Sequence, residues 1–371
     1  MAEILFWVLF SIDIVCVFVK RSPWFIVPVN LVYLFVITYG STSPDYWVYK
    51  ITYETGYLRS SVEIGYNLCM DICNKIGCDF DQFLLVMAVL FMSILLITFS
   101  RYSKNYALFF SVYLIYHFFI DLIQIRYFYA GVLFTVSVMM LIKGKKMIGG
   151  ILLLASCTFH ASMIFFLPLL LFDFDKRLSI KFIKRSSEMI IALCIVMFLL
   201  GKNFTPLVNV GINIVDHMGA SASAKSMYFE TTTRFGWILY FMLHFAIMFS
   251  TYYWRNKIYR IRNKSECSAT ELEKLDNCIK LCTGVLTLQF YCIYSFPFIM
   301  INVHFYRFYR CTFYLSALCW AMCSDQMKRT IDYYKSVALT FTSLLLYRIP
   351  LVQGIENIKD ILDSNRFLVG R

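Results

Sequence analysis

Charged side chains are scarce in this sequence, and their scarcity excludes an ordinary soluble domain. Only 16% of the 371 residues are Asp, Glu, Lys or Arg, whereas soluble domains usually carry about 25%. Hydrophobic residues make up 60% of the chain, and they gather in runs of roughly the 17–25 residues that cross a bilayer as a helix. The sequence therefore predicts an all-α, polytopic transmembrane helical bundle.

Acidic residues are few, with 23 Asp and Glu against 35 Lys and Arg and a formal net charge of +12. In a soluble protein this excess would suggest nucleic acid as a partner. Here the basic residues lie in short connections between apolar runs, as the positive-inside rule describes. We expect membrane lipid and an anionic, lipid-linked substrate as partners, and no nucleic acid.

Several site signatures are missing from the sequence. There is no GxGxxG, no P-loop and no HExxH motif, and no large segment outside the apolar runs that could hold a nucleotide sugar. Most of the 13 cysteines lie in apolar runs, where cysteine usually acts as a small hydrophobic residue. Cys69, Cys73 and Cys78 share one connection but lack CxxC pairs and histidine partners. We therefore predict no cofactor and no metal.

The apolar runs predict about 10–11 spans in a single integral-membrane domain, residues 1–371. The candidate spans are 4–19, 24–40, 82–99, 106–121, 127–142, 147–172, 187–201, 235–254, 280–301, 306–323 and 331–348. The basic loop 255–279 and the KGKK stretch at 143–146 are expected on the cytoplasmic side, and the loops 41–81 and 202–233 on the external side.

Residues 147–172 pose a topology conflict, because the segment 173–185 that follows is also basic. In the interpretation we prefer, 147–172 is a re-entrant hairpin broken near 158–162, with both ends cytoplasmic. In the alternative it is a full span, and the basic segment is external. A non-helical break at membrane depth must line a cavity or be buried in protein, so the hairpin would put His160 at a functional position.

The external loop 41–81 is predicted to contain an interfacial helix. Apolar residues recur at roughly helical spacing between 60 and 76, with Glu63 near the helix start. A second helix, cytoplasmic and capped near Ser268, is predicted over 265–277.

Three arginines are candidates for holding a diphosphate. Arg126 opens an apolar helix, and Arg307 and Arg310 are three residues apart and so share a helix face. The guanidinium group remains charged and its planar donors fit phosphate oxygens. The alternatives are snorkelling to the headgroups, ordinary interfacial anchoring, or a pair between Arg126 and Asp121.

Two residues are candidates for the catalytic base. His160 lies among hydroxyl residues at the expected break, where a neutral imidazole can accept a proton from a sugar hydroxyl. Glu63 is the second candidate, and the sequence does not choose between them. His117 and His244 are interpreted as packing residues.

Three further residues are candidates for contacting sugar: Asp45, Tyr46 and Gln124. Asp45 has the simpler interpretation of a helix N-cap after Pro44.

Four short motifs occur in a characteristic order: SPDYWVY, VEIGYN, QIRYFYAGVLF and ASCTFHASMIFFLPL. The order resembles the EpsG-like branch of the Wzy-type polysaccharide polymerases, which shows Asp-Tyr, Glu-x-Gly, Arg-x3-Ala and His-x-Ser motifs. The matching positions are Asp45-Tyr46, Glu63-Gly65, Arg126-Ala130 and His160-Ser162. The clear match covers about residues 25–172, so Arg307 and Arg310 rest on chemistry alone.

The resemblance implies a multi-pass enzyme of the bacterial inner membrane. Members of that family polymerise O-antigen or exopolysaccharide repeat units carried on undecaprenyl diphosphate, with no metal or nucleotide, and a chain-length regulator protein is a possible partner. The main alternative is a flippase or transporter for lipid-linked oligosaccharides. That function would favour polar residues spread along several spans rather than cations near one face. A membrane acyltransferase using a histidine lacks supporting partner residues.

Overall fold

The computed structural model describes residues 2–20, 23–57, 59–60, 62–200, 204, 236–264, 268–348 and 359–365. The named elements within these ranges are all helical, which confirms the predicted fold class. In chain order they are α1 (Ala2–Val19), α2 (Ile26–Gly40), α3 (Tyr46–Thr55), α4 (Ile64–Ile76), α5 (Phe80–Ser100), α6 (Tyr106–Val112), the π-helix η1 (Tyr113–His117), α7 (Phe118–Ile123), α8 (Ile125–Ile142), α9 (Lys146–Phe159), the 3₁₀-helix η2 (Ala161–Leu171), α10 (Arg177–Leu199), α13 (Gly236–Lys264), α14 (Ala269–Cys292), η3 (Ile293–Ser295), α15 (Phe296–Ile301), η4 (Val303–Tyr306), α16 (Arg307–Arg310), α17 (Phe313–Gln326) and α18 (Ile331–Arg348).

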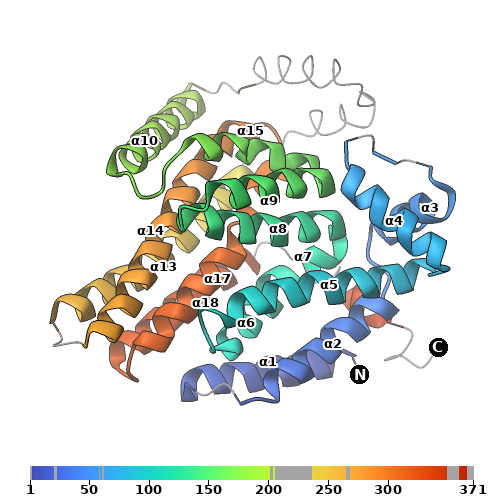
Figure 1. Ribbon diagram of the computed structural model, residues 1–371, viewed down its shortest axis with the longest axis horizontal. Coiled ribbons are helices and arrows are strands. Elements are labelled where there is room, and N and C mark those ends of the chain that lie inside the picture. Colours follow the sequence, from blue (N-terminus) through green and yellow to red (C-terminus); the bar gives the residue numbers. More distant parts are fainter. Residues whose placement is uncertain are drawn as a thin grey trace.

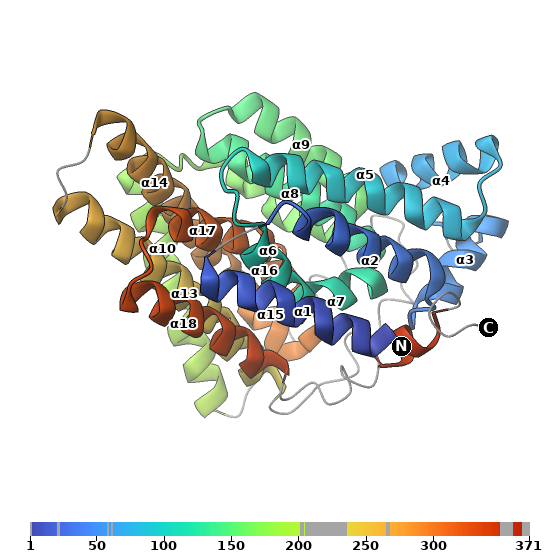
Figure 2. The ribbon, with the colours of Figure 1, turned by 90° about the horizontal axis from the view of Figure 1, so that it is seen from below.

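The helices form a bundle that is elongated along one direction (Figure 1). At its centre α8 packs against α9, while α13 packs against α14, α17 and α18, and α1 and α2 pack against α6 and α5. The short helices α3 and α4 lie at one end of the bundle, and the tip of the α13–α14 hairpin lies at the opposite end (Figures 1 and 2). This separation agrees with the expectation that 41–81 and 255–279 lie on opposite sides of a membrane.

Helix length and surface character identify a multi-pass membrane protein. Among the described residues, four helical segments are long and apolar enough to span a bilayer: Phe80–Ser100, Tyr106–Ile123, Ile125–Ile142 and Ala269–Ile301. Large apolar side chains on the outer faces are exposed, such as Trp7, Val32 and Ile97. Apolar surface on this scale is expected to meet lipid rather than water.

Two boundaries differ from the sequence prediction. The basic stretch 255–264, expected in a loop, is the last part of α13, and α14 continues without a break from the predicted cytoplasmic helix into the bundle. The expected capping at Ser268 is confirmed, because Ser268 and Glu271 form a reciprocal capping box. The predicted span 306–323 is wrong as a single helix. Two short helices precede α17, whose 14 residues are too few to cross alone.

The sequence also predicted a basic segment at 173–185 and an external loop at 202–233. The basic segment after residue 172 is largely helical, because α10 begins at Arg177. The expected external loop 202–233 lies outside the described residues, apart from Phe204.

Residues 147–172 form the predicted hairpin. Helix α9 ends at Phe159, His160 is extended with φ −152° and ψ 122°, and η2 begins at Ala161. The two arms return side by side, since the Lys146 Nζ atom lies 3.7 Å from the Asp173 Oδ2 atom. The first turn of α9 and the end of η2 are therefore at the same level (Figure 1), and the break lies at the far end of the hairpin.

The predicted interfacial helix is α4, with Glu63 at its N-cap position. Its apolar residues at four-residue spacing, Ile64, Leu68, Ile72 and Ile76, are all exposed. Such a stripe is suited to lie in the lipid headgroup region. The opposite face, with Tyr66 and Met70, is buried against the bundle.

The hairpin predicts which positions share a side of the membrane. In a variant without native cysteines, Lys145→Cys and Lys176→Cys should both react with a membrane-impermeant thiol reagent only when the cytoplasmic face is open. Glu54→Cys, at the end of α3, should react from the external face. Labelling of positions 145 and 176 from opposite faces would contradict the hairpin.

Candidate functional site

An ion pair joins the external helix α4 to the start of α8. The Arg126 Nη1 donates to the Glu63 Oε2, and the Arg126 guanidinium lies 5.0 Å from the ring centre of Tyr49 and 5.9 Å from that of Tyr66. Aromatic faces stabilise a cation that is partly withdrawn from water. The alternative pair between Arg126 and Asp121 does not form, and the Asp121 Oδ2 instead meets His117 Nδ1 at 2.8 Å.

Glu63 also reaches the tip of the hairpin. Its Oε1 accepts a hydrogen bond of 3.5 Å from the Ala161 N–H, the first residue of η2, so the carboxylate bridges Arg126 and the hairpin. The side chain of Glu63 is 7% exposed and that of Arg126 is 30% exposed. The Glu63 carboxylate is therefore a buried bridge.

Gly65 allows this approach. A Cβ atom added to Gly65 would lie 2.3 Å from the Thr158 Oγ1 and 3.2 Å from the Phe159 Cε2. Any side chain at position 65 would push α4 away from the end of α9. The Glu-x-Gly motif thus has a physical reason, since glycine brings the carboxylate two residues earlier within reach of the hairpin tip.

His160 is held by the residue that ends its motif. The Ser162 N–H donates to the His160 Nδ1 at 3.2 Å, and the Ser162 hydroxyl lies 2.8 Å from the same atom. Because a backbone N–H only donates, Nδ1 is an acceptor and the proton of the neutral ring resides on Nε2. The ring packs edge-on against Tyr127, with centres 5.4 Å apart.

Arg310 and Arg307 come to the same place from α16. The Arg310 guanidinium lies 4.3 Å from the ring centre of Tyr127, and its Nη1 donates to the Tyr306 hydroxyl at 3.3 Å. The Tyr127 hydroxyl donates to the backbone carbonyl of Arg307. Arg310 is only 1% exposed, whereas Arg307 is half-buried, and its Nε donates to the His304 carbonyl at 3.0 Å.

The three arginines all lie in the neighbourhood of His160. Arg126, Arg307 and Arg310 all lie close enough to His160 to interact with it. Burial raises the pKa of Asp45, and the charges of Arg126 and Arg307 oppose that rise. The site is thus a set of cations around His160 with one half-buried carboxyl beside it, at the same end of the bundle as α3 and α4.

The three tentative sugar contacts lie in different surroundings. Asp45 occupies the N-cap position of α3 without forming a capping hydrogen bond, so its carboxyl remains available to the site. The Tyr46 hydroxyl donates to Asp81 at 2.7 Å and ties α3 to α5. Gln124 lies at the α7–α8 junction, and its buried Oε1 has no hydrogen-bond partner in the described part of the chain.

Tyr127 is the residue that the sequence analysis missed. It contacts Arg310, His160 and the carbonyl of Arg307 at once. Its position directly after Arg126 was the one sequence feature that linked it to the site, but an aromatic residue at the start of an apolar helix usually lies at the membrane interface.

A second polar network lies deeper in the bundle. His117, taken as a packing residue, shares the Asp121 Oδ2 with the hydroxyls of Tyr113 and Tyr314. The buried Asp13, paired with Asn30 at 3.1 Å, was likewise not singled out. His244 is a packing residue that also contacts the Gln289 carbonyl at 2.9 Å.

The sequence model of one protein family, described as the EpsG family, matches residues 23–359 and so most of the chain. The chain belongs to the EpsG family. The matched range contains every residue of the site, including Arg307 and Arg310 in the part where the motifs were less clear. Membership of the EpsG family connects the protein with exopolysaccharide biosynthesis. No curated protein and no solved structure shows significant similarity to it.

The close approach at Gly65 predicts a stability effect in this EpsG-family protein. Gly65→Ala should lower the free energy of unfolding in detergent by about 1–3 kcal/mol, because an overpacked contact forces α4 from the hairpin. Thr158→Ala removes the nearest atom, so the double variant should recover part of the loss.

A matched control is Gly150→Ala in α9, where the new Cβ would meet Leu170 at an ordinary 3.6 Å. This change should be neutral or slightly stabilising in the same thermal unfolding assay. Equal losses at positions 65 and 150 would show that the α4–α9 contact is not tight.

Proposed function

We propose that this protein polymerises oligosaccharide repeat units carried on undecaprenyl diphosphate, at the external face of the bacterial inner membrane. One observation carries the proposal: three arginines from two distant parts of the chain converge on His160. The Arg126 Nε and the Arg310 Nε and Nη2 are buried donors without a hydrogen-bond partner among the described residues. Buried cationic donors require an anion or acceptor to offset their desolvation, and a lipid diphosphate supplies both.

The three arginines have different proposed roles, because their side chains differ in exposure. Arg126 and Arg307 are accessible enough to meet phosphate oxygens directly, and planar guanidinium groups bind these oxygens in pairs. Arg310 lies behind Tyr127 and contributes positive potential in a region of low dielectric, where charge interactions are strong. Diphosphate is the leaving group, so cations placed in advance stabilise the charge that develops on it.

His160 supports the leaving group rather than removing a proton. With Nδ1 accepting from the Ser162 N–H, the neutral ring presents an Nε2–H donor. A donor is suited to a phosphate or sugar oxygen and cannot accept a proton at that atom. The Glu63 carboxylate is occupied by Arg126 and the Ala161 N–H, so Glu63 acts as a positioning residue.

Asp45 is the carboxyl best suited to be the base. It is half-buried beside Arg126 and Arg307, makes no capping hydrogen bond, and has a pKa raised by burial. A raised pKa makes a carboxylate a stronger base near neutral pH. Asp45 therefore replaces His160 and Glu63 as the proposed proton acceptor.

The reaction is a direct displacement. A hydroxyl of the acceptor unit attacks the anomeric carbon of the donor, a new C–O bond forms, and the C–O bond to the diphosphate breaks. The bonding electrons leave with the diphosphate, and the hydroxyl proton passes to Asp45. Lipid diphosphate and a longer glycan are the products, and a chain-length regulator is a further proposed partner.

Loss of Arg126 tests the proposal. In the native host, Arg126→Ala should reduce polymer by about 10²–10³-fold, the usual effect of removing one transition-state donor, while single repeat units still reach the cell surface. Arg59→Ala is a matched control. Arg59 is another external arginine, but it pairs with Asp71 at 2.7 Å away from the site. Loss of single units as well would point to a transport step and overturn the polymerase proposal.

Asp45 can be tested in the same assay. Asp45→Asn removes the proton acceptor and should abolish polymer, with lipid-linked repeat units accumulating. Asp71→Asn, on the outer surface of α4, should leave polymer unchanged. Full polymer synthesis by the Asp45→Asn variant would exclude Asp45 as the base while leaving the diphosphate site intact.

A further inference from the structure

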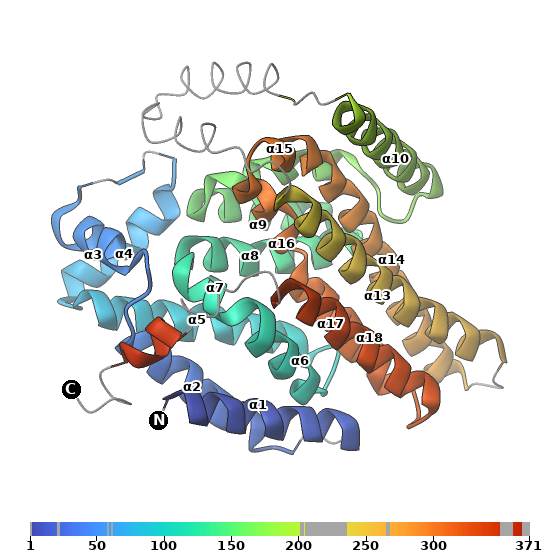
Figure 3. The same cartoon turned by 180° about the vertical axis from the view of Figure 1, so that it is seen from behind.

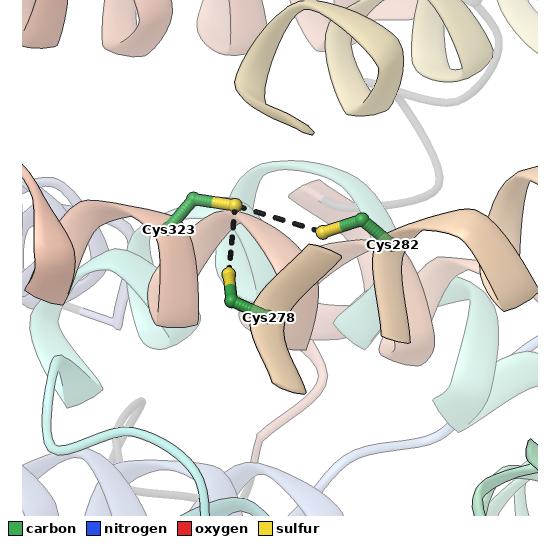
Figure 4. A group of neighbouring side chains, drawn as sticks. All are labelled: Cys278, Cys282 and Cys323. Atoms are coloured by element: carbon green, nitrogen blue, oxygen red, sulfur yellow. Dashed lines mark hydrogen bonds between the residues drawn. The ribbon is translucent and has the colours of Figure 1, made fainter. Parts of the chain in front are cut away.

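Two pairs of cysteines face each other across α14 and α17. Cys278 and Cys282 are four residues apart on α14, and Cys319 and Cys323 are four apart on α17. Residues at this spacing share a helix face, and the two helices pack together. Figure 4 shows the sulfur atoms of Cys278, Cys282 and Cys323 pointing toward one another from the two helices.

The sulfur positions suit a metal ion. The Cys323 Sγ lies 3.4 Å from the Cys278 Sγ and 3.6 Å from the Cys282 Sγ, and all three sulfurs lie within 4.8 Å of one another. Zinc–sulfur bonds of about 2.3 Å in a tetrahedron place sulfur atoms about 3.8 Å apart. Small side-chain adjustments would therefore give metal–ligand distances. Cys319 is a neighbour of Cys282 but lies outside the group of three converging sulfurs, so its side chain would have to turn to become a fourth ligand.

A large cavity lies beside the two helices that carry the cluster. A cavity of about 760 Å³ is lined by Asn277, Leu281 and Met322, each a direct sequence neighbour of a clustered cysteine. The same cavity is bordered by several cations, among them Lys274 and Lys280. Asp325 lines the cavity as well, so the cavity carries charges of both signs.

The cavity also identifies the compartment. Its lining includes Arg101, Lys104 and Lys143 from the basic connections that mark the cytoplasmic side. Thiols remain reduced in the cytoplasm, so the cysteines are available as ligands rather than joined as disulfides. A buried cysteine alone is usually a small hydrophobic residue, but three whose sulfur atoms converge from two helices form a ligand set.

We propose that Cys278, Cys282 and Cys323 bind a thiophilic metal ion, Zn²⁺ or Cu⁺, which clamps α14 to α17. These ions are the ones that thiolate ligands select. Binding releases the thiol protons to solvent and forms metal–sulfur bonds without any change of oxidation state. The chain between α14 and α17 carries Arg307 and Arg310, so the clamp would fix the two helices that carry this segment, at their ends away from it.

Metal protection of the native chain is the first test. The full-length protein in detergent is stripped of metal by a chelator, and Zn²⁺ or Cu⁺ is then added back to half of the sample. Both halves are exposed to an alkylating reagent while denaturant begins to unfold them, and the modified peptides are measured. We expect the added metal to slow alkylation of Cys278, Cys282 and Cys323 at least 10-fold, because coordinated thiolates do not react. Cys194, buried elsewhere on α10, should show no metal-dependent protection.

Metal content of variants is the second test. The protein purified from zinc-supplemented cells should contain one ion per chain by mass spectrometry of the elements. The triple variant Cys278→Ser, Cys282→Ser and Cys323→Ser should contain none, and Cys194→Ser should keep its metal. A wild-type chain that is folded by size-exclusion chromatography but neither protects these cysteines nor retains metal would overturn the proposal.

Cys319→Ser separates the two ions. Zinc prefers four ligands, so this variant should bind zinc at least 10-fold more weakly if zinc is the natural ion, as the loss of a ligand predicts. Binding of Cu⁺ by the remaining three thiolates should be almost unchanged. Equal affinity of the wild type and the triple variant for both ions would again contradict the site.

Discussion

The ion pair between Glu63 and Arg126 is the constraint on which the external end of this bundle depends. Each charge alone would be destabilising when partly buried at a membrane boundary, because removing an ion from water is costly unless a partner is present. Their pairing joins α4 to α8, and the second oxygen of Glu63 reaches the Ala161 N–H at the hairpin tip. One carboxylate thereby fixes three elements from separate parts of the chain in relation to each other.

Aromatic rings stabilise the buried guanidinium groups of the site. Tyr49 and Tyr66 lie against Arg126. Tyr127 contacts both Arg310 and His160, and its hydroxyl donates to the Arg307 carbonyl in α16. Cation–π contacts offset part of the lost hydration but do not neutralise charge. The site therefore keeps the positive character on which the proposed binding of a diphosphate rests.

The two ends of the bundle have complementary roles in these proposals. The external end gathers cations around His160, and the cytoplasmic end holds the cysteines of α14 and α17. The irregular segment between these two helices connects them, because short helices and 3₁₀ turns carry Arg307 and Arg310 from one to the other. Such a segment has few helical hydrogen bonds of its own, so its position depends on the helices that flank it.

The sequence by itself determined the helical membrane class, the broken helix at His160 and the interfacial helix starting near Glu63, and it predicted the arginines as anion ligands. Hydrophobic periodicity, charge placement and motif order are local properties, and each of these conclusions rests on them. Only the tertiary structure decided which charges meet. It paired Arg126 with Glu63 rather than Asp121, made Tyr127 central, and brought CxxxC pairs about forty residues apart into one cluster. Contacts between distant residues depend on how the helices pack, and local sequence patterns do not show which side chains meet across a helix–helix interface.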